Sequence, residues 1–131
     1  MHALKQPLLL VSLLSLLGCN EAITSDGKAV VCTAQFVYGL QIKVFDQETG
    51  YPNACGSDVT IQDGSYLEEL NYSPSNDCDE DYVFLAAGER AGNYTITVNK
   101  DGYQQWQRDN IELTANVCHV NPITVEVYLE K

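Results

Sequence analysis

The sequence predicts an all-β protein, folded as a seven-stranded antiparallel β-sandwich, and three observations lead to that expectation. Short apolar stretches alternate with polar residues, turn-forming residues separate these stretches, and no stretch sustains the periodicity of a helix. About seven short strands with turn signals between them are typical of two antiparallel sheets packed face to face. A helical or mixed α/β fold is therefore not expected.

The clearest strand signals are segments in which every second residue is apolar. In the first of them, Leu40, Ile42 and Val44 alternate with Gln41 and Lys43. This period of two places the apolar set on one face, and a shift of one residue would turn the whole set to water. The same pattern covers residues 40–44, 59–62, 94–98 and 123–129. Further strands are expected at residues 66–72, 82–86 and 104–112.

Glycine, proline and asparagine mark the turns between these strands. Glycine supplies positive φ where a turn needs it, and proline fixes the chain that follows. The expected turns are Thr49-Gly50 with Pro52, Asp63-Gly64, Pro74-Ser75-Asn76, Ala91-Gly92-Asn93 and Asp101-Gly102.

The first 18 residues have the composition of an export signal. Lys5 precedes an apolar run from Pro7 to Leu17, and Gly18 provides a small residue before Cys19. The run is roughly half of the about 20 apolar residues that a transmembrane helix needs. We therefore expect residues 1–18 to be removed, which leaves Cys19 first. The alternative is an ordinary signal peptide in which Cys19 has no special role.

The tetrapeptide Leu16-Leu17-Gly18-Cys19 resembles the lipobox of bacterial lipoproteins. The resemblance implies a diacylglycerol on the Cys19 sulfur and a further acyl chain on the new amino terminus, and two or more chains anchor stably in a membrane. The membrane is thus an expected partner through acyl chains on Cys19. Asn20 is not the aspartate associated with retention at the inner membrane, so the resemblance implies a bacterial cell envelope location, lipid-anchored at the outer membrane.

The mature chain is expected to be one acidic domain on a short tether. Residues 19–28 would form the lipidated cysteine and the tether, and residues 29–131 the domain. Loss of Lys5 with the signal leaves 18 acidic and six basic side chains, a net charge of −12. Such a surface repels nucleic acid, so no nucleic-acid partner is expected.

Four motifs along residues 41–129 carry a second resemblance. They are Thr49-Gly50-Tyr51-Pro52, Asp63-Gly64, Gly92-Asn93-Tyr94 and Gly102-Tyr103. In this order they are similar to the carboxypeptidase regulatory-like domain, a transthyretin-like (prealbumin-like), immunoglobulin-like sandwich. The resemblance implies a noncatalytic binding or scaffold domain. The enlarged acidic segment between Tyr72 and Tyr82 departs from the family pattern.

Four cysteines remain once Cys19 is assigned to lipid, and an exported domain keeps its disulfides. Three pairings are possible. The terminal strands of such a sandwich run close together, which favours Cys32 with Cys118 and leaves Cys55 with Cys78. The alternative is a metal site, but no CxxC pair is present, and zinc sites usually have closer ligand pairs.

No catalytic constellation is evident, so we expect no enzyme and no cofactor. His119 is the single histidine after the signal, and no serine lies in a GxSxG context. A hydrolase would need His119 exposed in a cleft with a nucleophile within reach.

Two weaker features suggest ligands. Asp77, Asp79 and Asp81 crowd one loop with Glu80, and oxygen ligands on a flexible segment suit Ca²⁺. The alternative is a solvated acidic loop that Cys78 holds in place.

The second feature is the aromatic pair Tyr103 and Trp106, which could stack on sugar rings or fill the core. The sequence thus favours a noncatalytic envelope lipoprotein whose sandwich binds an envelope protein. A carbohydrate-binding module that uses Trp106 and Tyr103 on a glycan partner is the alternative.

Overall fold

The structure is a computed structural model that describes residues 21–73 and 77–131. The expected signal peptide and the lipidation site Cys19 lie outside these residues. The described residues contain strands and no helix, and so no helix that could cross a membrane. The strands are β1 (Glu21–Ile23), β2 (Ala29–Val31), β3 (Tyr38–Asp46), β4 (Ser57–Asp63), β5 (Tyr66–Asn71), β6 (Val83–Gly88), β7 (Gly92–Lys100), β8 (Trp106–Leu113) and β9 (Ile123–Leu129).

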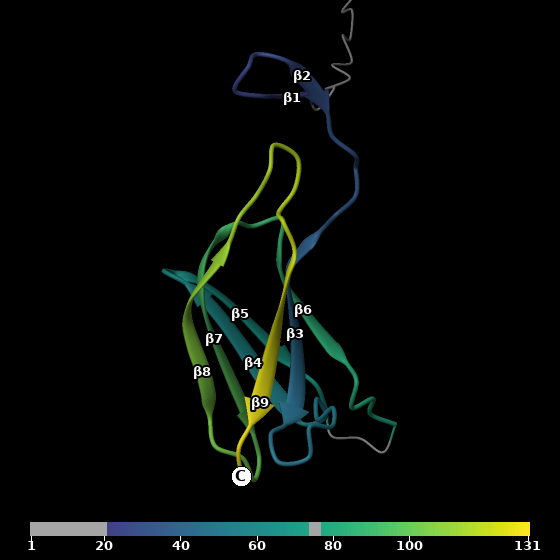
Figure 1. The fold of residues 1–131 in the computed structure, drawn as a ribbon, viewed down its shortest axis with the longest axis vertical. Coiled ribbons are helices and arrows are strands. Elements are labelled where there is room, and N and C mark those ends of the chain that lie inside the picture. Colours follow the sequence, from purple (N-terminus) through teal and green to yellow (C-terminus); the bar gives the residue numbers. More distant parts are fainter. Residues whose placement is uncertain (1–20, 74–76) are drawn as a thin grey trace, which may run out of the picture.

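Seven of these nine strands form two larger sheets, and the other two form a separate hairpin (Figure 1). One sheet has the order β6-β3-β9, and the other has the order β5-β4-β7-β8. All seven segments expected to be strands are strands, and the all-β expectation is confirmed. The expected total of seven was wrong because β1 and β2 were missed: each has only three residues, too few to show an alternation.

The expectation of a wholly antiparallel fold was also wrong. β3 pairs with β9 in parallel, from Leu40 opposite Ile123 to Asp46 opposite Leu129. The alternation of apolar and polar residues has the same period in parallel and antiparallel strands, so it carries no information about direction. All other strand pairs in the described ranges are antiparallel.

The core lies between the two larger sheets. Leu40, Ile42 and Val44 of β3 are almost completely buried, as the alternation predicts, and they belong to one apolar cluster with Ile61 and Ile96 of the facing sheet. Full burial of one such side chain contributes about 1.5–3 kcal/mol to folding.

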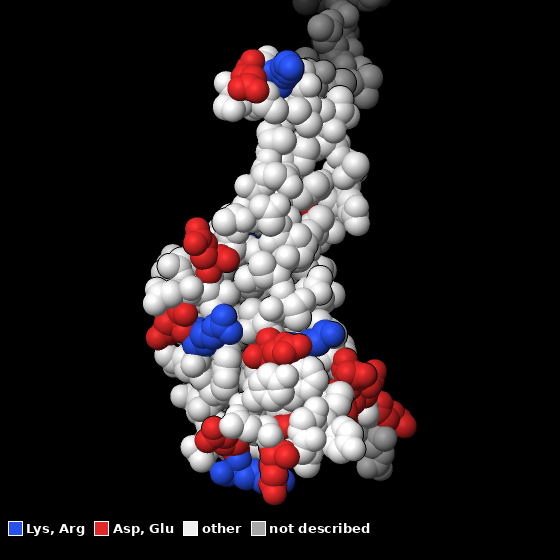
Figure 2. All heavy atoms as spheres, in the orientation of Figure 1, with Lys and Arg blue, Asp and Glu red and all other residues white. Residues whose placement is uncertain are grey.

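A narrow region of chain, which we call the neck, connects the β1–β2 hairpin to the sandwich. It consists of residues 32–37, which lead into β3, and residues 114–122, which join β8 to β9 and extend toward the hairpin (Figure 1). Neither segment contains Asp, Glu, Lys or Arg. In the space-filling view, the stretch between hairpin and sandwich is accordingly mostly uncharged, whereas acidic groups are spread over the sandwich (Figure 2).

Candidate functional site

Two disulfides join the four cysteines of the domain. Cys32 is bonded to Cys118, and Cys55 is bonded to Cys78, which confirms the expected pairing. The sulfurs are therefore bonded to one another rather than available to a metal. The first disulfide closes the neck, and the second attaches the acidic loop to the turn before β4.

The neck contains a cavity of about 510 Å³ beside the Cys32–Cys118 disulfide. Phe36 and Val117 line it with apolar surface, although their exposed fractions are 61% and 45%. Large apolar side chains that remain exposed around one concave surface are a common feature of binding sites. Thr33, Glu89 and His119 supply the polar part of the lining.

His119 lies in this cavity between a hydroxyl and a carboxylate. Its Nε2 is 3.1 Å from Thr33 Oγ1, and its Nδ1 is 2.8 Å from Glu89 Oε1. The order hydroxyl, imidazole, carboxylate is also that of nucleophilic hydrolases. Thr33 thus places a hydroxyl within reach of His119, but the histidine side chain is only 20% exposed, whereas a hydrolase was expected to need it exposed in a cleft.

Glu89 also has a structural role in the neck. Its carboxylate accepts hydrogen bonds from the backbone N–H groups of Val37, at 2.8 Å, and Val120, at 3.4 Å. Burial raises the pKa of Glu89, but the hydrogen bonds from His119, Val37 and Val120 outweigh burial and hold that pKa below its ordinary value. Glu89 thus ties both neck segments to the turn between β6 and β7.

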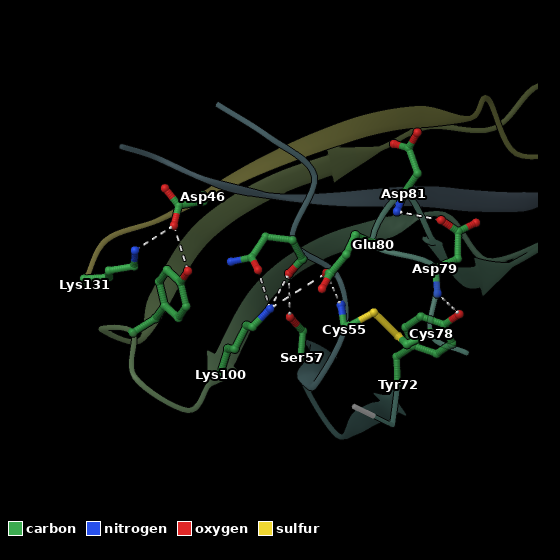
Figure 3. A network of polar contacts seen from close by, with 12 residues as sticks. Asp46, Cys55, Ser57, Tyr72, Cys78, Asp79, Glu80, Asp81, Lys100 and Lys131 are labelled. Atoms are coloured by element: carbon green, nitrogen blue, oxygen red, sulfur yellow. Dashed lines mark hydrogen bonds and ion pairs between the residues drawn. A yellow bond between two sulfur atoms is a disulfide. The ribbon is translucent and has the colours of Figure 1, made fainter. Parts of the chain in front are cut away.

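A second polar cluster lies at the opposite end of the sandwich, around Asp46 at the end of β3. The Tyr103 hydroxyl donates to Asp46 Oδ2 at 2.7 Å, and the backbone N–H of Thr49 donates to Oδ1 at 2.9 Å. Lys131 Nζ lies 3.5 Å from Oδ2 (Figure 3). These contacts, led by that of Tyr103, hold the pKa of Asp46 well below its ordinary value even though burial opposes them.

Lys100, at the end of β7, lies in the same region with its side chain largely buried. Its Nζ donates to the backbone oxygen of Asn53 at 2.9 Å and to the side-chain oxygen of the same residue. The carboxylate of Glu80 is 4.0 Å from Nζ (Figure 3). Burial lowers the pKa of Lys100, and the charges of Glu80 and Asp46 only partly oppose that effect.

The described carboxylates of the acidic loop are not gathered as a preformed calcium site would have them. Asp79 Oδ1 instead accepts the backbone N–H of Asp81 at 2.9 Å (Figure 3). Within residues 21–73 and 77–131, no three His, Cys, Asp or Glu side chains gather so that they could hold a metal ion. Asp77, Asp79 and Asp81 are therefore not gathered into one ligand set in this structure.

Tyr103 and Trp106, the suggested sugar-stacking pair, line different cavities. Tyr103 lines a cavity of about 560 Å³ with Lys100, and its hydroxyl is bonded to Asp46. Trp106 lines a groove of about 360 Å³ with Tyr128. The polar lining of this groove consists of Gln47, Gln104, Gln105, Gln107 and Glu130. Both suggested residues also pack partly against the core. The aromatic residue that shares the groove with Trp106 is Tyr128, and Tyr103 does not line it.

Sequence reasoning missed the roles of Asp46, Glu89 and Lys100. Each is a single charged residue at the end of a strand or in a turn, where solvated charges are common. The Asp46 position could have been suspected, because an Asp three residues before Thr49 fits a side chain that caps a turn.

No family model matches this chain, and neither a curated protein nor a solved structure matches it in the comparisons.

Proposed function

We propose that this chain is a noncatalytic, lipid-anchored lipoprotein of the bacterial cell envelope, with a transthyretin-like sandwich of the carboxypeptidase regulatory type that binds another protein. The anchor would be the acyl chains on Cys19, and the binding surface would be the neck cavity. The observation that carries the proposal is the exposed apolar lining of that cavity, Phe36 and Val117, on an otherwise acidic protein.

The disulfides support the location. The other four cysteines form two disulfides, Cys32–Cys118 and Cys55–Cys78. Lipidation of Cys19 would therefore leave none of them without a partner. Stable disulfides are typical of proteins exported from the cytoplasm. With a net charge of −12 after signal removal, attachment to anionic lipid by charge is unfavourable, so acyl chains are the plausible means of anchorage.

The anchor is tested by the Cys19→Ser variant in cells that process lipoproteins. We expect the native protein to sediment with membranes and to yield an acylated amino-terminal peptide that begins at Cys19. The variant should lose the acyl mass and the membrane attachment. A native protein that keeps residues 1–18 would contradict the proposal.

The neck is tested by a photo-crosslinking amino acid at position 36 in the native envelope. We expect crosslinks to one protein, and their loss when Val117 is changed to Ser. Leu67 provides the matched control, because it is 55% exposed but lies on β5 in the other sheet. Equal crosslinking from positions 36 and 67 would exclude the neck as a specific surface.

A carbohydrate-binding module is the second candidate, and the groove around Trp106 and Tyr128 supports it. Aromatic rings beside several side-chain amides suit the faces and hydroxyls of sugars. Because Trp106 is the single tryptophan of the chain, envelope glycans bound in the groove would change its fluorescence. Gln107→Ala should weaken that response, whereas Gln41→Ala, on the other sheet, should leave it unchanged.

The hydrolase alternative is tested at Thr33 and His119. A noncatalytic domain should show no turnover of p-nitrophenyl esters above buffer. Turnover that Thr33→Val and His119→Ala both abolish, in variants that remain folded, would instead make the neck cavity an active site.

A further inference from the structure

The amine of Lys100 is held against the side-chain amide of Asn53. Nζ lies 2.5 Å from Asn53 Oδ1 and 2.9 Å from the backbone oxygen of the same residue, so the amine cannot turn away without breaking two hydrogen bonds. Because a C=O bond is about 1.2 Å long, the amide carbon Cγ is at most about 3.7 Å from Nζ. The two groups are thus within reach of bond formation.

The nitrogen of that amide is the one buried side-chain polar atom without a hydrogen-bond partner among the described residues. It is Asn53 Nδ2. A buried donor with no acceptor costs free energy, and such atoms are rare in folded proteins. Loss of this nitrogen from the side chain would remove the unfavourable group.

The surroundings favour a reactive amine. The Lys100 side chain is only 13% exposed, and burial lowers its pKa, which increases the fraction of the neutral, nucleophilic form. Glu80 Oε2 is 4.0 Å from Nζ, a separation across which a proton can pass through one water.

Glu80 is held in this position from its other side. Its Oε2 accepts the backbone N–H of Cys55 at 2.9 Å, and Cys55 is fixed by its disulfide to Cys78. An amine, an amide and a carboxylate from three separate segments therefore meet at one place, where the amine is largely buried and the carboxylate is half exposed (Figure 3).

We propose that Lys100 and Asn53 form an intramolecular amide cross-link, in which Lys100 Nζ displaces the side-chain nitrogen of Asn53 as ammonia. Glu80 first takes one proton from the Lys100 ammonium, and the neutral amine then bonds to Asn53 Cγ. The second amine proton passes to Nδ2 as the Cγ–Nδ2 bond breaks. Together with the proton from Glu80, the leaving group departs as an ammonium ion, so charge and atoms balance and no oxidant or cofactor is needed.

The cross-link would join the end of β7 to the turn before β4 across 47 sequence positions. Unlike the two disulfides, it would survive reducing agents. Glu80 has the role of a positioning and proton-transfer group, and it remains unmodified.

Intact mass spectrometry of the folded full chain, after reduction of both disulfides, tests the proposal. We expect a mass lower than the sequence mass by one ammonia molecule, about 17 Da. Digestion with trypsin should then yield a branched peptide that contains both Asn53 and Lys100. A folded protein with the full sequence mass would overturn the proposal.

Variants separate this reaction from ring closure of an asparagine to a succinimide, which releases the same mass. Lys100→Arg keeps the charge but removes the nucleophile, and it should restore the full mass, whereas Lys43→Arg on β3 should still show the loss. Glu80→Gln keeps an acceptor for the backbone N–H of Cys55 but cannot take the proton from Lys100. It should therefore slow formation of the cross-link at least tenfold. Persistence of the loss in Lys100→Arg would overturn the proposal.

Discussion

Asp46 is the clearest case of a residue whose structural role depends on distant partners. Tyr103, which lies 57 positions away, donates to one carboxylate oxygen, and Thr49 donates to the other. The pKa of Asp46 is therefore lower in the folded chain than in the unfolded chain, where an aspartate titrates near pH 4. Its contribution to stability is present above about pH 4 and is lost as the pH falls toward the lowered value.

Replacement of Tyr103 by Phe should make the domain more sensitive to acid. The variant removes the hydrogen bond that lowers the pKa of Asp46 most, so we expect acid unfolding, followed by circular dichroism, to begin at a higher pH. Tyr128→Phe is the control, because its hydroxyl donates to Glu126 on the surface. If both variants shifted the acid transition equally, the effect would not belong to Asp46.

Among the strand glycines, Gly39 on β3 is the one where an added Cβ should cost most. A Cβ there would lie 2.2 Å from Leu113 Cδ2 and 3.1 Å from the backbone oxygen of Ala87. Leu113 is buried and cannot move freely. We expect Gly39→Ala to lower the free energy of unfolding by about 1–3 kcal/mol in urea titrations.

Gly88 on β6 provides a matched comparison for Gly39. A Cβ there would also come within 2.2 Å of a side chain, but that side chain is the exposed ring of Phe36, which can turn toward water. Gly88→Ala should therefore cost less than Gly39→Ala. If Gly88→Ala lowered the free energy of unfolding more than Gly39→Ala, the Leu113 side chain would shift to make room for the added methyl group more easily than its burial indicates.

At the scale of strands, the sequence predicted the positions of the strands better than the details of their pairing. Residues 123–129 match β9 at both ends, and the apolar positions of β3 face the core as expected. β8 follows the alternation only near its end, since Gln107 to Asn110 are all polar and exposed, and its ladder with β7 has a bulge between Tyr94 and Ile96. Such a local insertion is set by pairing with a neighbour and is not visible in one strand alone.

The candidate sites could be predicted only in part, for a related reason. The disulfides could be paired because the terminal strands of a sandwich run close together, which favours Cys32 with Cys118 and leaves one other pair. Thr33 and His119, by contrast, are 86 positions apart, and Asn53 and Lys100 are 47 apart. Their residue types are ordinary on any surface, so only the arrangement of the sheets shows that they meet.

For the whole molecule, the two disulfides should differ in their effect on stability. Cys32–Cys118 spans 86 positions and Cys55–Cys78 spans 23. Because a longer closed loop restricts the unfolded chain more, replacement of the first pair by Ala should cost about 4 kcal/mol and of the second about 3 kcal/mol. Urea unfolding of the two double variants measures both values, and a larger loss from the shorter loop would point to native contacts of the acidic loop instead.

The Cys32–Cys118 disulfide also determines how the domain would respond to mechanical load. Tension between the two ends of the chain would pass from Cys32 directly to Cys118 and into β9, so residues 33–117 would carry none of it. β9 is itself an extended strand, so the loaded path from Cys118 through β9 has little slack, and the ladder with β3 from Leu40 to Asp46 stays outside that path. The fold is thus arranged to withstand pulling at its amino-terminal end.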